Sequence, residues 1–410
     1  MDRLPIVVMK FGGTSVADAE GRTAVAQRVQ AAIEAGTAPV VVVSAMGRAG
    51  APYATDTLLA MIAGLPADAR EKDLLASTGE VVSAVVTAHE LRAAGIDATA
   101  FTGVEAGILT DGAHGSASVT GVDAKPLLEA IDAGRVPVVA GFQGVSENGA
   151  ITTLGRGGSD TTACALGVGL GATSVEIYTD VDGVMSADPR ACDGAQVLET
   201  IGAEELFQMA RHGSRVMHTP AAELALASGL PVRVRGTTSD HAGTLVTDLG
   251  HYTPVGVATA VTHVEDIARV SVLLPAAEGT PEHMAAQTRV YQAMADADVS
   301  LDMFTPAGDR LIFTTAEDAV DRACEALDGL AVGHSVERCL AKVTLVGAGM
   351  HGVPGVMARV TAYLSQADVP VLQAADSHTT ISVLVPATDA GAAVAALHAG
   401  FGLGGSAERA

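Results

Sequence analysis

The sequence contains no tryptophan, its aromatic residues amount to 3%, and only four lysines occur among its 410 residues. No apolar run approaches the roughly 20 residues that a membrane-spanning helix needs, so we expect no membrane protein. The cysteines lie far apart without a C-x-x-C pair, which favours small core thiols over disulfides or a zinc site. They are Cys164, Cys192, Cys324 and Cys339.

Positive charge is also scarce, because 24 Lys and Arg residues face 47 Asp and Glu residues and leave a net charge of −23. This charge argues against binding to nucleic acids and to anionic membranes. A protein of this charge that binds anions must gather its few cations locally, so Lys10, two residues before Gly12, and Arg156, between two glycines, stand out. The N-terminus lacks the pattern of a signal peptide, so we expect a cytoplasmic protein.

The patterning of the chain predicts more than one domain. As far as residue 249, apolar segments alternate with alanine-rich helical stretches, which predicts a mostly parallel sheet sandwiched by helices. From residue 255 onward, two units each follow the order strand, helix, strand, strand, and their first strands are expected at Ala268–Leu274 and Ala341–Val346. We therefore predict domains over residues 1–249, 255–333 and 338–410.

The segment Met9-Lys10-Phe11-Gly12-Gly13-Thr14-Ser15 directly continues an apolar strand. Glycine amides can approach phosphate oxygens closely, a following helix adds its positive end, and the lysine adds a mobile charge. The lysine precedes the glycines, so this is no Walker A motif. The pattern indicates a polyphosphate site.

A second glycine-rich segment, Gly155-Arg156-Gly157-Gly158-Ser159-Asp160-Thr161-Thr162, opens an alanine-rich helical stretch. An arginine between unencumbered amides suits an anion, and it can grip a carboxylate with two parallel hydrogen bonds. The alternative is a glycine-rich surface turn that Ser159 or Asp160 caps.

A third segment runs from Thr179-Asp180-Val181-Asp182-Gly183-Val184 into Met185-Ser186-Ala187-Asp188-Pro189-Arg190. Its Asp-x-Asp-Gly resembles part of a calcium loop but lacks the remaining ligand positions, which favours contact with a nucleotide. Ser44, Thr55 and Glu80 are further polar candidates near the ends of apolar segments, where helix capping is the alternative.

Together, these segments resemble the signature motifs of the aspartate kinase family. Lys10–Val16 is similar to the N-terminal signature, and the glycine–arginine and Asp-x-Asp-Gly segments are similar to the two other strong motifs, in the same order. The resemblance implies an amino-acid kinase fold followed by two ACT-type α+β, ferredoxin-like modules. It also implies transfer of the γ-phosphoryl of ATP to the β-carboxylate of L-aspartate, the first step toward lysine, diaminopimelate, threonine and methionine.

The resemblance further implies roles for individual residues. Lys10 is expected to neutralise the phosphoryl oxygens and Asp160 to orient Lys10, which makes both catalytic. ATP is expected to contact Lys10, Phe11, Gly12, Gly13, Thr179, Asp180, Met185, Ser186, Ala187, Asp188, Pro189, Arg190 and Arg215. L-Aspartate is expected to contact Ser44, Thr55, Glu80, Arg156, Gly157, Gly158 and Ser159. Mg²⁺ is expected on the ATP phosphates and not on a protein site.

The C-terminal units imply feedback regulation by an amino acid, which could be diaminopimelate, lysine or threonine. ACT modules pair through their sheets, so a homodimer or a larger homo-oligomer is expected. The expected effector contacts, for which ordinary strand-end polarity is an equal alternative, are Ser300, Asp302, Gln373, Asp376, Ser377 and Thr379.

Shorter segments carry a finer resemblance. Val43–Arg48, Pro52–Asp56 and Gln373–Thr380 are similar to the diaminopimelate-regulated aspartate kinases of Bacillus-type bacteria. Arg215 stands where relatives place a lysine and Thr219-Pro220 where they place proline and arginine, and both departures bear on nucleotide affinity. The alternatives are a kinase for another amino acid and a catalytically weak amino-acid sensor.

Overall fold

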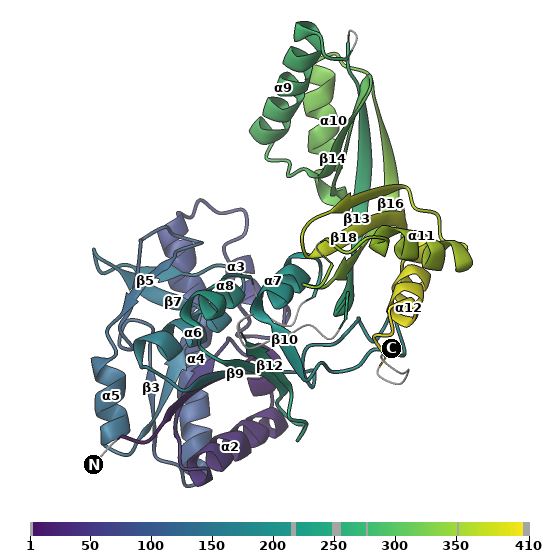
Figure 1. Ribbon diagram of the computed structural model, residues 1–410. Helices are drawn as coiled ribbons and strands as arrows, with labels where there is room; N and C mark the ends of the chain where they lie inside the picture. The colour runs from purple at the N-terminus through teal and green to yellow at the C-terminus, as the bar shows by residue number, and fades with distance from the viewer. Residues whose placement is uncertain (1–2, 215–218, 248–255, 276–277, 351, 405–410) are drawn as a thin grey trace. The chain divides into compact units, whose positions relative to one another are not determined.

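The computed structural model (Figure 1) describes residues 3–214, 219–247, 256–275, 278–350 and 352–404. Contacts divide the chain into two compact units. The first unit comprises Met1–Val184, Val197–Arg211 and Arg215–Thr253. The second comprises Met185–Gln196, His212–Ser214 and Pro254–Ala410, so a piece of the motif region joins the C-terminal part.

The larger sheet of the first unit confirms the expected mostly parallel architecture. Its neighbouring strands run parallel, except that β11 and β12 pair antiparallel. In order across the sheet, the strands are β10 (Thr200–Gly202), β12 (Thr244–Thr247), β11 (Val232–Gly236), β9 (Ser174–Thr179), β1 (Ile6–Phe11), β2 (Ala38–Val43), β6 (Val136–Ala140) and β3 (Ala98–Phe101).

Strand β1 sends alternate side chains to the two faces of this sheet. Val7, Met9 and Phe11 join the apolar core formed with helices α2 (Ala19–Glu34) and α4 (Ala69–Ala93). Lys10 faces the other side, where helix α6 (Gly158–Gly169) contacts β1. The remaining helices of the unit are α1 (Gly13–Val16), α3 (Thr55–Ala60), α5 (Lys125–Asp132), α7 (Ala203–Arg211) and α8 (Thr219–Ser228).

A smaller sheet of the first unit leads into the glycine–arginine segment. Its strand β7 follows β6 closely, and its strand β8 ends just before Gly155. The strands, in order across the sheet, are β5 (Val119–Val122), β4 (Ile108–Thr110), β7 (Gln143–Ser146) and β8 (Ile151–Thr153).

The second unit is built on one continuous sheet that the two strand-helix-strand-strand repeats share. The strand order is β14 (Asp302–Ala307), β15 (Arg310–Ala316), β13 (Ala260–Leu273), β16 (His334–Val346), β18 (Thr380–Pro386) and β17 (Gln373–Asp376). Figure 1 shows α9 (Pro281–Asp296) and α10 (Val320–Gly329) at one end of the long strands and α11 (Val356–Gln366) and α12 (Ala390–Gly400) at the other. Short 3₁₀ turns at Glu317–Ala319 and Ala387–Asp389 precede α10 and α12.

The two repeats are less separate than the sequence predicts. The expected first strands, Ala268–Leu274 and Ala341–Val346, are halves of the long neighbours β13 and β16. Val261, at the start of β13, packs in the core of the second repeat, whereas Val270 on the same strand packs in the core of the first. A register shift beyond Val264 separates the two halves, because each half must follow the twist of its own repeat.

The outermost strands of this sheet also contact each other. Lys342, on the central strand β16, is 7% exposed and pairs with Asp302 on β14. The side-chain amide of Gln373 on β17 donates to the carbonyl of Met303 on β14. Met303 also fills a small apolar cluster with Leu340 and Leu384. A buried ammonium needs such a carboxylate partner, so the pair helps to hold the sheet closed on this side.

We predict that the Lys342–Asp302 pair makes the stability of the second unit sensitive to acid. Burial alone would raise the pKa of Asp302, but the bond and charge of Lys342 and the Met303 amide hold it below its usual range. The pair therefore stabilises the fold above the unfolded-state pKa of about 3.9, and this contribution is lost as the pH falls through the lower folded-state pKa. The melting temperature of Asp302→Asn should lie below wild type at pH 7, and the two should converge as the pH falls below about 4. The exposed control Asp309→Asn should follow wild type throughout, and a gap for Asp302→Asn that stays constant with pH would contradict the prediction.

Candidate active site

The candidate site lies where four neighbouring strands of the larger sheet reach their carboxyl ends. Strand β1 ends at Phe11, β2 at Val43, β6 at Ala140 and β9 at Thr179. Because β1 pairs with β2 on one side and β9 on the other, the connections diverge here. Open α/β sheets bind ligands at this kind of switch point.

A buried ion pair stands at the centre of this edge. The Lys10 ammonium lies 2.7 Å from the carboxylate of Asp160, and both side chains are nearly buried. Asp160 occupies the first turn of α6, whose N-cap is Gly157 in the left-handed conformation with φ 69°. Gly158 must be glycine, since a Cβ there would come within 2.8 Å of the Phe142 ring. The glycine–arginine segment thus sets the start of α6 and with it the position of Asp160.

The glycines after Lys10 let two loops approach closely. A Cβ on Gly13 would lie 2.5 Å from the carbonyl oxygen of Ala45 and 2.8 Å from that of Gly47. The amide of Gly47 donates to the carbonyl of Gly13 at 2.9 Å, which ties the loop after β2 to the start of α1. The amide of Gly12 already donates to the Tyr178 carbonyl at 3.3 Å. Gly12 therefore offers a ligand close approach more than a free donor.

Glu80 reaches the same loop from helix α4. The side chain is buried, and its Oε1 accepts from the Ala45 amide at 3.1 Å. Its Oε2 is buried without a well-formed hydrogen bond among the described residues. Burial raises the pKa of Glu80 to about 7, against opposing hydrogen bonds that include those from Ala45 and the Thr55 hydroxyl. A buried carboxyl with a spare oxygen suits a cationic ligand group.

Helix α4 lies directly against the segment between β2 and α3. This segment begins at Ser44, and Thr55 is the first residue of α3. A Cβ on Gly79 would come within 2.6 Å of the Tyr53 carbonyl oxygen and 2.9 Å of the Ala45 Cβ. Ser44 follows the last residue of β2, and its amide donates to the Phe11 carbonyl at 3.2 Å. The structure therefore brings Ser44, Thr55 and Glu80 to the same edge of the sheet as Gly13.

Arg156 is exposed on the turn before α6, and within the described ranges its guanidinium has no hydrogen-bond or ion-pair partner.

Beneath this turn lies a buried carboxylate that no motif indicated, Asp73 of α4. It accepts hydrogen bonds from His114, Gly115 and Thr153. Only its spacing, seven residues before Glu80 on the same helix, could have drawn attention to it in the sequence.

The candidates after β9 have mixed surroundings. Asp180 is exposed and forms an ion pair of 2.7 Å with Arg48. The Thr179 hydroxyl donates to Asp180 at 3.1 Å, and its carbonyl accepts from the Thr237 amide at 3.0 Å. These contacts connect the end of β9 to the loop after β2 and to the segment after β11.

The next candidates, Met185–Arg190, belong to the second unit. Ser186 is fully buried, and its hydroxyl forms a 2.8 Å hydrogen bond with His398 of α12. Ala187 packs in the core of the second repeat, and Asp188 pairs with Arg190 at 2.7 Å. Arg215, also predicted to contact ATP, lies outside the described residues.

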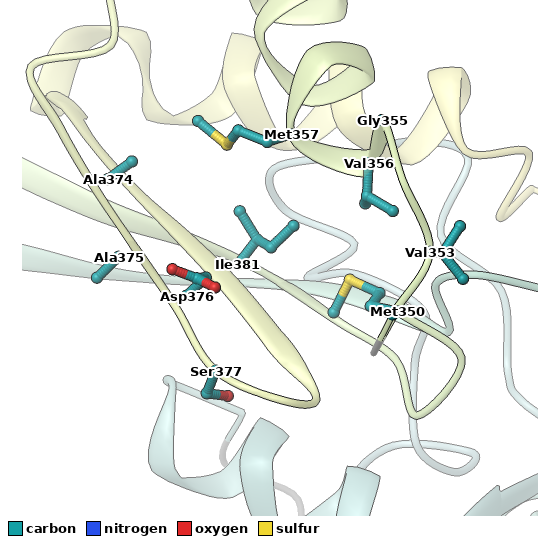
Figure 2. Close-up of a pocket in the computed structure, with 11 residues that line it drawn as sticks. Met350, Val353, Gly355, Val356, Met357, Ala374, Ala375, Asp376, Ser377 and Ile381 are labelled. Atoms are coloured by element: carbon teal, nitrogen blue, oxygen red, sulfur yellow. The ribbon is translucent and has the colours of Figure 1, made fainter.

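A separate pocket of about 430 Å³ lies within the second repeat (Figure 2). Met350 and Val356 provide an apolar wall, and the end of β17 with Asp376 and Ser377 forms the other side, where Ile381 of β18 lies beside Asp376. Asp376 is exposed, and no partner for its carboxylate occurs among the residues that the structure describes.

The other predicted effector contacts lie elsewhere. Asp302 and Gln373 are engaged in the contacts between β14, β16 and β17 described above. The Ser300 carbonyl accepts from the Thr315 hydroxyl at 3.0 Å, and the Thr379 amide donates to Ser377 at 3.4 Å. Two of the six residues expected to contact an effector, Asp376 and Ser377, line the pocket.

Two family models match parts of the chain. Residues 5–236 match the amino acid kinase family, and residues 335–399 match the ACT domain. Aspartokinase 1 of Bacillus subtilis is 42% identical over 98% of this chain and 100% of its own length. The helices in the described part of the chain all lack the length and apolar content needed to cross a bilayer.

Solved structures give the same result. Escherichia coli aspartokinase III in complex with aspartate and ADP, an R-state structure, has a TM-score of 0.77 at 26% identity and covers 96% of this chain and 99% of its own. The same enzyme in complex with lysine and aspartate, a T-state structure, has a TM-score of 0.76 at 27% identity, covering 97% and 99%. The fold and site define an amino acid kinase with an ACT regulatory region. The chain belongs to the aspartokinases and is an aspartate kinase, as its motifs predict.

We predict that Glu80 gives the unliganded enzyme a distinct pH dependence of stability. Its folded-state pKa of about 7 lies above the ordinary value of 4.5 for a glutamate. Between these pH values the folded state retains a proton that the unfolded state loses, so the stability falls as the pH rises, by about 3 kcal/mol. Denaturant unfolding at pH 5 to 8 should show this fall, and Glu80→Gln should remove it. Glu71→Gln, an exposed change on the same helix, should leave the slope intact, and an unchanged slope in Glu80→Gln would disprove the assignment.

Proposed function

We propose that Lys10 and Asp160 form the catalytic centre for phosphoryl transfer in this aspartate kinase. The observation that carries the proposal is their 2.7 Å ion pair at the switch point of the sheet. An acceptor carboxylate is already a nucleophile, so the reaction needs no general base. The difficulty is to bring two anions together and to stabilise the charge of the phosphoryl group in flight. Lys10 supplies that stabilisation, and Asp160 holds its ammonium in place.

We assign two protein residues of opposite charge to L-aspartate, the phosphoryl acceptor. One binds its α-carboxylate and the other binds its α-ammonium. Arg156 is exposed and unpartnered on its turn, which leaves its guanidinium available for the α-carboxylate. Glu80 has a buried oxygen to spare for the α-ammonium. Ser44 and Thr55 contact the substrate from the loop after β2, and the amides of Gly157, Gly158 and Ser159 line the turn beside Arg156.

ATP is the phosphoryl donor, in agreement with the ADP found in the E. coli relative. We assign its contacts to Phe11, Gly12 and Gly13 at the end of β1 and to Thr179 and Asp180 after β9. Two acidic groups at the edge are already paired, Asp160 with Lys10 and Asp180 with Arg48. This donor set fits a Mg²⁺ ion that arrives on the phosphates with its own waters and neutralises phosphate charge.

We also propose that the pocket beside Asp376 binds the feedback effector. Its apolar walls and single carboxylate suit the ammonium and aliphatic chain of an amino acid. The E. coli relative binds lysine in its T-state. The resemblance of Gln373–Thr380 to the diaminopimelate-regulated class favours diaminopimelate here over lysine or threonine.

We further propose that the enzyme is a cytoplasmic homo-oligomer whose subunits pair through their ACT modules. We propose that the effector inhibits it by shifting an equilibrium between two global states.

We predict that Lys10→Ala lowers kcat by a factor on the order of 10² or more, because it removes the main electrostatic stabiliser. Arg156→Ala should instead raise the KM for aspartate and change kcat less. Hydroxamate detection of the acyl phosphate measures both parameters. The control Lys125→Ala removes an exposed lysine and should behave as wild type. Turnover at the wild-type rate in Lys10→Ala, or product with another amino acid in preference to aspartate, would contradict the proposal.

For regulation, we predict that Asp376→Asn weakens inhibition by the effector at least tenfold and leaves the uninhibited rate unchanged. Titrations with diaminopimelate, lysine and threonine identify which ligand acts. Glu325→Gln changes an exposed acid on α10, outside the pocket, and should keep wild-type inhibition. Equal inhibition of Asp376→Asn and wild type would place the effector elsewhere.

A further inference from the structure

We propose that Asp73 is a positioning residue for the acceptor amino acid, because it holds the Arg156 turn at a defined place relative to Glu80. The proposal rests on the proposed roles of Arg156 and Glu80 and assigns a role to residues that the motifs do not include. Asp73 contacts neither the reacting atoms nor Arg156 directly, and it acts through Thr153 and residues 114–117.

The carboxylate of Asp73 is a fully occupied acceptor. It is 2% exposed. Its Oδ1 accepts from the Thr153 hydroxyl at 2.5 Å, and its Oδ2 lies 2.7 Å from His114 Nδ1. The Gly115 amide donates to both oxygens, at 3.0 and 3.1 Å. A single buried group thereby ties together α4, strand β8 and the segment that includes His114 and Gly115.

These contacts continue to the Arg156 turn. Thr153 is the last residue of β8, three positions before Arg156, and its carbonyl accepts from the Ala117 amide at 2.9 Å. Gly155 packs on the same segment, since a Cβ there would lie 3.4 Å from the Gly115 carbonyl oxygen. The turn is therefore supported by Thr153 and Gly115, which Asp73 bonds directly, and by Ala117, which bonds Thr153.

The same helix also positions Glu80. Seven residues separate Asp73 from Glu80, which is nearly two turns, so both carboxylates share a face of α4. Between them, the Ser77 carbonyl accepts from the Gln143 side-chain amide at 2.9 Å, a second link from α4 to the smaller sheet. Because the α-carboxylate and α-ammonium of an amino acid are a fixed distance apart, their two partners must also be. Helix α4 connects the two partners, because it carries Glu80 itself and supports the Arg156 turn through Asp73.

The test uses the full-length enzyme and two substitutions of one residue. Thr153→Val removes the hydroxyl bond to Asp73 at nearly constant volume, and Thr153→Ser keeps it. We expect Thr153→Val to raise the KM for aspartate about tenfold, the effect of one lost buried hydrogen bond, and to leave the KM for ATP within about twofold. Thr153→Ser should behave as wild type. Asp73→Asn should shift the KM for aspartate in the same direction.

A matched control separates positioning from general loosening of the fold. Thr110→Val removes another buried hydroxyl bond of the smaller sheet, the 2.7 Å contact with Thr152. It should lower the melting temperature as Thr153→Val does, without changing the KM for aspartate. A KM that rises equally in both variants, or that rises equally for ATP and aspartate, would overturn the proposal.

A double-mutant cycle tests whether Thr153 acts through Arg156. In the Arg156→Ala background, Thr153→Val should add little to the KM for aspartate, because the group that it positions is gone. Fully additive effects would refute the proposal. If Arg156→Ala and Glu80→Gln both leave the KM for aspartate unchanged, the acceptor assignment itself fails. If they raise it and Thr153→Val does not, that assignment stands and the role of Asp73 is excluded.

Discussion

The ion pair between Lys10 and Asp160 is the constraint on which the first unit depends. A nearly buried ammonium is tolerated only beside a carboxylate, so helix α6 must begin where Asp160 can meet the end of β1. That start requires the left-handed Gly157 and the crowded Gly158. The same glycines carry Arg156 into solvent. One electrostatic requirement thus determines where the Lys10–Asp160 pair lies and which turn stands beside it.

The proposed binding site for the amino-acid substrate depends on helix α4 in a comparable way. Its Gly79 allows the backbone of the loop after β2 to approach, and Glu80 then caps the Ala45 amide from within the protein. An enzyme that must recognise a small zwitterion gains selectivity when the partners of both charges are held rigidly. A helix with buried polar links at Asp73, Ser77 and Glu80 provides that rigidity more effectively than a loop could.

The regulatory region shows why two repeats in the sequence need not be two separate modules. Strands β13 and β16 each contribute to the cores of both repeats. The edge strands β14 and β17 meet through Gln373, and the Lys342–Asp302 pair joins β14 to β16. A disturbance at one repeat therefore alters contacts of the other. The chain also continues without interruption from Val184 of the first unit to Met185 of the second, where Ser186 bonds His398. This continuity gives the ACT regulatory region a covalent connection to the segment that follows β9.

The sequence by itself determined the order of elements, the parallel sheet and the aspartate kinase motifs, because apolar periodicity and glycine-rich turns are local properties of the chain. Lys10, Glu80, Arg156 and Asp160 could be proposed as site residues because each stands in or beside a recognisable local pattern. Only the tertiary structure decided that Asp73 meets Thr153 across 80 residues, that Ser186 is buried, and that Lys342 pairs with Asp302. The physical reason is that burial and pairing depend on which distant segments fill the same space. No spacing within a single segment encodes that.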